Sequence, residues 1–133
     1  MLTAMTTFWT RFMQLPDSIR VTAWWAHQRE VDFPYIQGRR STLLMVDMPA
    51  MAAQYPSVAA ALKAAGLTAQ QHEASLLAIA SAYAWWDHSN RPVIPSVMKN
   101  AVFLQAHPDE LQALYKTGVF DTYGRHGLSP KPS

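Results

Sequence analysis

The segment from Thr68 to His88 constrains the fold of this chain more than any other, because it predicts one long helix that is apolar on nearly all sides. Thr68 and Gln71 match a capping box, in which a Thr hydroxyl and a Gln side chain each bond the other residue's backbone amide. Apolar residues recur at helical spacing and also fill the other faces: Leu76, Leu77, Ala78, Ile79, Tyr83, Trp85 and Trp86. A helix with so little polar surface is usually buried on several sides. We therefore expect a central helix over residues 69–88.

Proline and glycine divide the rest of the chain into short elements. The patterns predict helices over residues 19–30, 56–65 and from about residue 97, and a further one that begins at Pro108. Gly66 and Gly118 are placed to end helices in a left-handed conformation. Residues 31–38 are typical of an extended loop, and residues 41–46 of either a short strand or a buried helical turn.

These elements together predict the fold class and the domain organisation. We expect one all-α domain over residues 1–123, a compact bundle of four to six short helices with irregular Pro-rich connections. At most a minor strand is expected, near residues 41–46. Residues 124–133 contain two glycines and two prolines without periodicity, which predicts an extended C-terminal tail.

The composition indicates that part of the surface is covered by something other than water. Only 15% of the 133 residues are charged, against roughly 25% in a typical soluble domain. A small domain has a high ratio of surface to volume and needs polar residues to cover it. The net charge is +2 and the basic residues are scattered, so nucleic-acid binding is not expected. The absence of cysteine rules out disulfides, Cys-ligated zinc and thiol catalysis within this chain.

The polar residues form no recognisable catalytic or metal-binding pattern. None of the five histidines belongs to an HExxH pair, and no serine lies in a G-x-S-x-G elbow. His88 follows Asp87 at a helix C-terminus, where interaction with the helix dipole explains it better than metal or haem ligation. His107, Asp109 and Glu110 lie at a helix start, where capping explains them better than acid–base catalysis. We therefore predict no enzymatic activity, no metal and no cofactor.

Aromatic residues are the unusual feature of this sequence. Trp24-Trp25 and Trp85-Trp86 are adjacent pairs, and neighbours on a helix point about 100° apart, so both members of a pair do not face one direction. A large aromatic core and an interface that uses one Trp of each pair both remain open. A third aromatic group near the N-terminus suits either a protein partner or an interfacial membrane anchor. The predicted partner-binding residues are Phe8, Trp9, Phe12, Trp25, Trp85, Tyr123 and Leu128.

The sequence also bears on location. The first twenty residues lack the apolar stretch of a secretory signal, so we expect no cleaved leader. The longest uncharged apolar stretch, residues 74–86, falls short of the roughly twenty residues that span a bilayer. We expect a peripheral membrane protein bound to a membrane complex, on the cytoplasmic face because no signal peptide is visible, with the periplasmic face left open.

A family resemblance is carried by the run YPSVAAALKAAGLTAQQ at residues 55–71 and, further on, by Asn100, Phe103, His107, Glu110 and Leu111. This pattern resembles small all-helical bacterial proteins of unknown function, over roughly residues 49–115. The resemblance implies an all-helical fold and no particular activity. In its general character, the chain as a whole is similar to auxiliary subunits of bacterial photosynthetic or respiratory membrane complexes.

The functional prediction is a non-catalytic accessory subunit that packs against and stabilises a larger, membrane-associated complex. Its expected partners are protein subunits, with peripheral contact to the membrane surface and none with nucleic acid. The alternative is a small-molecule or cofactor-binding helical module, with a pocket between the central helix and the Trp24-Trp25 helix that Tyr83 and His88 help to line.

Overall fold

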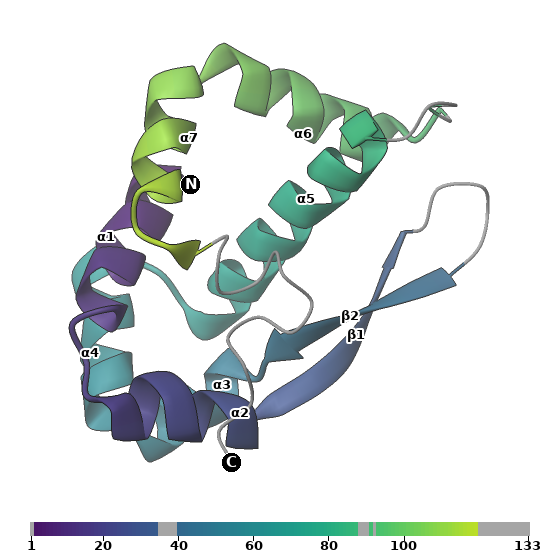
Figure 1. The fold of residues 1–133 in the computed structure, drawn as a ribbon. Coiled ribbons are helices and arrows are strands. Elements are labelled where there is room, and N and C mark those ends of the chain that lie inside the picture. The colour runs from purple at the N-terminus through teal and green to yellow at the C-terminus, as the bar shows by residue number, and fades with distance from the viewer. Residues whose placement is uncertain (1, 35–39, 88–90, 92, 120–133) are drawn as a thin grey trace.

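The computed structural model describes residues 2–34, 40–87, 91 and 93–119. Within these residues it contains seven α-helices, one π-helical segment and one two-stranded sheet (Figure 1). The elements in chain order are α1 (Leu2–Phe12), η1 (Ser18–Ala23), α2 (Trp24–Ala26), β1 (Gln28–Pro34), β2 (Arg40–Val46), α3 (Met48–Gln54), α4 (Pro56–Ala65), α5 (Ala69–Asp87), α6 (Pro95–Ala106) and α7 (Pro108–Tyr115). The all-α prediction is confirmed, with a small sheet added to it.

The number of helices exceeds the four to six expected because several are very short. Helix α3 begins after Asp47, whose carboxylate accepts a hydrogen bond from the Ala50 amide, and it ends where Tyr55 adopts an extended conformation before Pro56. Helix α4 then begins at Pro56, as predicted. The tail at residues 124–133 lies outside the described residues.

The prediction of a helix over residues 19–30 is wrong for its last four residues, 27–30. The π-helix η1 and the short α2 end at Ala26, and β1 begins at Gln28. Strands β1 and β2 pair antiparallel, with Gln28 opposite Val46 and Pro34 opposite Arg40. Residues 40–46 are therefore a strand rather than a helical turn. Local spacing did not predict β1 because its hydrogen-bond partners come from residues 40–46, which lie further along the chain.

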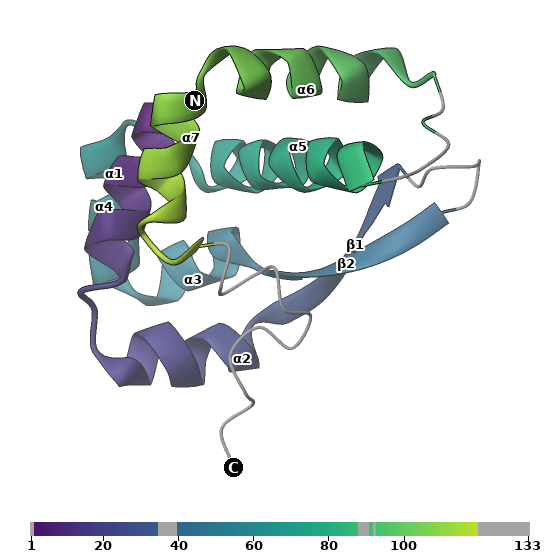
Figure 2. The same ribbon diagram turned by 45° about the horizontal axis from the view of Figure 1, so that its top comes forward.

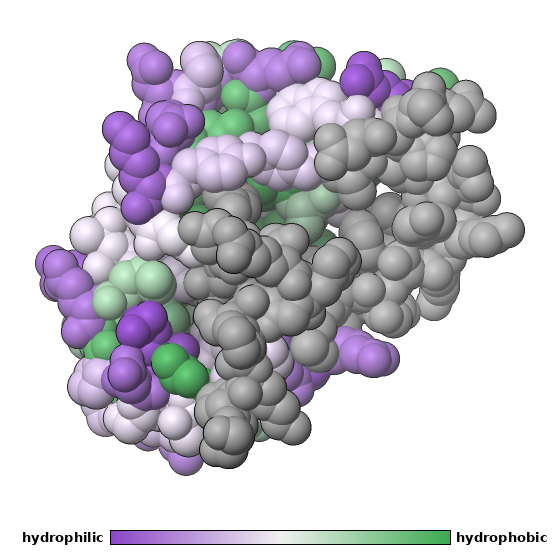
Figure 3. Space-filling view, viewed as in Figure 1, coloured by the Kyte–Doolittle hydropathy of each residue, from purple (hydrophilic) through white to green (hydrophobic). Residues whose placement is uncertain are grey.

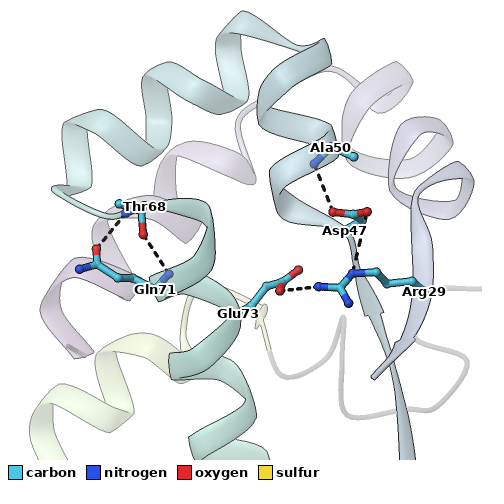
Figure 4. Close-up of polar contacts among 6 residues, drawn as sticks. All are labelled: Arg29, Asp47, Ala50, Thr68, Gln71 and Glu73. Carbon is cyan, nitrogen blue, oxygen red and sulfur yellow. Dashed lines mark hydrogen bonds and ion pairs between the residues drawn. The ribbon is translucent and has the colours of Figure 1, made fainter. Parts of the chain in front are cut away.

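The central helix forms as predicted, and its first turn shows why it begins there. The Thr68 amide donates to Gln71 Oε1 at 2.9 Å, and the Gln71 amide donates to Thr68 Oγ1 at 3.0 Å (Figure 4). Gly66 ends the preceding helix with φ of 70°, in the left-handed region. The reciprocal bonds of the capping box satisfy two backbone amides, so the register of α5 is set at its start.

The helices gather around α5 and α1 (Figures 1 and 2). Helix α6 lies alongside α5 at one edge of the molecule, and α1 packs against both α4 and α7. The β-hairpin extends away from α2 and α3, with the first part of β1 close to α5. Each of the longer helices buries one stripe toward a shared core, and α6 buries Val97, Ala101 and Leu104.

Candidate protein-binding surface

The structure corrects the prediction for three of the expected partner-binding residues. Phe8, Trp9 and Phe12 of α1 are at most 1% exposed, and they pack in the core of the chain. The ring centroids of Phe8 and Trp9 lie 5.7 Å apart and those of Trp9 and Phe12 lie 5.0 Å apart, both in edge-to-face arrangements. The apolar stripe of α1 faces α4 and α7, so these rings contribute to folding and not to a surface.

Two further predicted residues retain exposed surface. Trp25 and Trp85 are half-buried and pack against the edge of the core. The guanidinium of Arg91 lies 5.2 Å from the centre of the Trp85 ring, a cation–π contact. In the first tryptophan pair the two side chains do diverge, since Trp24 is buried while Trp25 is not. Contact of Trp25 and Trp85 with a partner stays a prediction.

The other two predicted contact residues, Tyr123 and Leu128, lie outside the described residues. His88, which was considered as a ligand and as part of a pocket, lies outside them as well.

A buried histidine that the sequence reasoning did not single out lies beside the α1 aromatic residues. The indole N–H of Trp9 donates to Nε2 of His72 at 3.1 Å, so Nε2 is an acceptor and the neutral ring carries its proton on Nδ1. Nδ1 has no hydrogen-bond partner among the residues that the structure describes. Burial lowers the pKa of His72 from 6.5 to about 4. His72 is thus a neutral packing residue; its spacing of four from Leu76 on the buried stripe could have indicated this.

His107, Asp109 and Glu110, which were considered for acid–base catalysis, do not form a site. The His107 Nδ1–H donates to the Phe103 carbonyl at 2.8 Å, and the imidazole stacks on the Phe103 ring at 4.2 Å. The His107 side chain therefore does not cap α7, contrary to expectation. Asp109 and Glu110 are exposed in the first turn of α7, where their negative charges interact favourably with the positive end of the helix dipole. Among the described residues no group of three or more His, Asp or Glu could hold a metal ion.

A small charged network holds the hairpin against the helices (Figure 4). Arg29 of β1 pairs with Glu73 of α5 at 2.5 Å, and its Nε lies 3.9 Å from Asp47. Asp47 in turn caps α3 through the Ala50 amide. All three charged groups belong to contacts between elements, so this network is structural.

The surface feature that remains unexplained is a concentration of exposed apolar residues. Val93 is 82% exposed, Val102 65%, Tyr115 42% and Phe103 38%. All four lie between residues 93 and 115, on α6, on α7 or on the segment that leads into α6. Figure 3 shows hydrophobic residues among hydrophilic ones on the part of the surface that α6 and α7 form. Clustered exposed apolar residues mark interaction sites, whereas single scattered ones do not.

Helix α6 carries two of these four residues, Val102 and Phe103, outside its buried stripe. Its buried stripe is Val97, Ala101 and Leu104, and the predicted spacing of these residues is confirmed. Lys99, Val102 and Ala106 follow an i, i+3, i+7 pattern, which places them together on another side of the helix, and all three are exposed. The sequence predicted the helix and its inner stripe, but which side lacked a neighbour depended on the packing.

A depression of about 420 Å³ lies elsewhere, between α3, α4 and the start of α5. It is open to solvent and mostly apolar, lined by Ala52, Ala59, Leu62, Lys63, Gly66, Leu67, Thr68 and Ala69. This is not the place where a pocket was expected, between the central helix and the Trp24-Trp25 segment.

Comparison with known proteins finds no family model, no curated protein and no solved structure that matches this chain. The family resemblance therefore stays a prediction. In the described part of the chain no helix is both long enough and apolar enough to cross a membrane.

Proposed function

We propose that this chain is a non-catalytic accessory subunit that packs against a larger protein assembly through the exposed side of α6. The observation that carries the proposal is the exposure of Val102 and Phe103 on a helix that also buries Val97, Ala101 and Leu104 in the fold, together with exposed Val93 just before this helix. Removing a Val or Phe side chain fully from water is worth about 1.5–3 kcal/mol, so this surface offers a real driving force for association.

The surroundings of this surface also suit a protein interface. Interface cores are poor in charged residues and rich in aromatic ones. Arg91, which precedes α6, places its guanidinium over the ring of Trp85 in α5, and Phe103 of α6 stacks with His107. These partly exposed aromatic side chains are of the types that often contribute most to binding energy. We propose no reaction for the chain.

The second part of the proposal is location: the assembly is membrane-associated and this subunit is peripheral to it. The low charged fraction and the five tryptophans support this part. The test is fractionation of native cells. We expect the chain in the membrane fraction, released with its assembly by mild detergent; recovery of the whole population in the soluble fraction would refute this location.

The docking proposal is tested by two matched substitutions on α6. Val102→Glu places a charge within the exposed side of α6, and Gln105→Glu makes the same charge change three residues further on the same side, where the wild-type residue is already polar, so it tests whether loss of the apolar side chain rather than added charge matters. After purification from native membranes in mild detergent, we expect the wild type and Gln105→Glu to co-migrate with partner subunits and Val102→Glu to be free of them. An assembly that keeps the Val102→Glu chain, or a wild-type chain that runs as a monodisperse monomer without any partner, would contradict the proposal.

One observation favours the alternative of a small-molecule-binding module, namely the apolar depression with Lys63 among its lining residues. The depression is open to solvent and its lining holds few polar groups, whereas ligand sites enclose most of the ligand. Native mass spectrometry of the purified chain decides between the two: a stoichiometric bound lipid or chromophore would favour the binding module.

A further inference from the structure

We infer that the exposed side of α6 pairs with the same side of a second copy of this chain, antiparallel and across a two-fold axis near Val102. This inference rests on the proposed function, because it names a partner for the same surface. It comes from the order of charged and apolar residues along α6 and the turn that follows it.

Charged residues flank the exposed side of α6 in the sequence, with basic Lys99 before Val102 and acidic Asp109 and Glu110 after it. Lys99 lies in the N-terminal half of α6, Val102 and Ala106 follow it on the same side, and Asp109 and Glu110 come just after the helix ends. All five residues are exposed, and none of the three charged ones takes part in an ion pair among the described residues. Lys99 and Ala106 are seven residues apart, about 10 Å along the axis.

An antiparallel copy complements this order and a parallel copy does not. When two such helices run in opposite directions about Val102, Lys99 of each copy lies opposite Gln105 of the other, toward the helix end that Asp109 and Glu110 follow and away from the other copy's lysine. A two-fold axis makes this contact twice, as in the isologous interfaces of most homodimers. A parallel arrangement would place Lys99 against Lys99 and the acidic residues against each other, which is repulsive.

The same charges argue against a membrane as the direct occupant of this surface. Anionic lipids attract basic segments, whereas Asp109 and Glu110 at one end would be repelled. A helix that lies in the lipid interface is rich in Lys and Arg on its polar face, and α6 has Lys99 alone. The helix is short, about 18 Å, and covers less than a standard interface, so the expected dimer is weak, with a dissociation constant above about 1 µM.

Charge reversal with rescue tests the pairing, with sedimentation velocity of the full chain from about 1 µM to about 1 mM as the measurement. We expect a concentration-dependent dimer that high salt weakens. Lys99→Glu should raise the dissociation constant about tenfold, and the double change Asp109→Lys with Glu110→Lys should do the same. Combining all three changes should restore the wild-type value, which a general loss of stability would not do.

Two further variants complete the test, each checked for folding by far-ultraviolet circular dichroism. Val102→Glu should abolish the dimer, and Lys63→Glu, the same charge reversal as Lys99→Glu but at an exposed residue of α4, should leave it intact. A chain that stays monomeric at every concentration, or a triple variant that does not recover, overturns the inference. Flotation of the monomer with phosphatidylcholine–phosphatidylserine vesicles, lost in Val102→Glu, overturns it in favour of a lipid surface.

Failure of this inference and failure of the proposed function give different results. If the chain is monomeric but Val102→Glu still loses its assembly in native extracts, the surface binds another protein and the proposed function stands. If the chain dimerises through Val102 and the variant nevertheless keeps its assembly, the pairing stands and the proposed docking site is refuted.

Discussion

The burial of His72 predicts that this fold loses stability in mild acid. The unfolded chain binds a proton at His72 below about pH 6.5, whereas the folded chain does not until about pH 4. Between these values folding must release the proton, so the free energy of unfolding falls as the pH is lowered from about 6.5 to about 4. Above about pH 6.5 the contribution is fully present. The difference of the two pKa values, at 1.36 kcal/mol per unit, amounts to about 3 kcal/mol.

The contact with Trp9 acts in the same direction. Its indole N–H donates to Nε2 of His72, and a proton on Nε2 would bring two N–H donors face to face in the core with no acceptor between them. Protonation therefore costs a hydrogen bond in addition to the desolvation of the charge. A loss of about 3 kcal/mol is a large part of the 5–15 kcal/mol typical of a domain.

The assay is urea unfolding, followed by circular dichroism at a series of pH values from neutral to about pH 4. The matched variant is His72→Gln, which keeps an oxygen acceptor for Trp9 but does not titrate. We expect the wild type to lose up to about 1.4 kcal/mol per pH unit relative to the variant within this window. Parallel pH profiles for the two proteins, or an imidazole resonance of His72 that titrates near pH 6.5 in the folded chain, would refute the reasoning.

Three further predictions concern local structure. Thr68→Ala should lower the free energy of unfolding by about 1 kcal/mol, measured by thermal unfolding, because it removes half of the capping box; no change would mean that α5 does not depend on this cap. Gly66→Ala should also destabilise by about 1 kcal/mol, through its φ of 70° alone, since an added Cβ would meet no atom within 4 Å; a gain in stability would contradict the left-handed cap. Arg29→Met should cost less than about 1 kcal/mol because the Arg29 side chain is 42% exposed and water screens its ion pair with Glu73. The loss should shrink in high salt; a salt-independent loss would show that packing, not charge, links the hairpin to Glu73.

The helices that the sequence predicted best are those whose end residues themselves determine where the helix begins or stops. Thr68 with Gln71, Gly66 and Pro108 act within one turn of the chain, so their effects are readable without knowing the fold. The inner stripe of α6 was predictable for the same reason, because helical spacing alone brings Val97, Ala101 and Leu104 together. The all-α class follows from these local signals.

What depended on the tertiary structure was everything that required a distant partner. The strand β1 exists because residues 40–46 pair with it, whereas the local patterns alone predicted a helix to residue 30 and an extended loop from residue 31. Phe8, Trp9 and Phe12 were predicted at a surface, yet they pack against His72 of α5 and Trp24 of α2, since an apolar stripe does not specify which neighbour will bury it. Helix α6 shows the converse, because Val102 and Phe103 are as apolar as core residues and are exposed only because no described element packs on their side. Sequence spacing determines which residues share a face, but burial is a property of two faces meeting, and only the folded chain decides which faces meet.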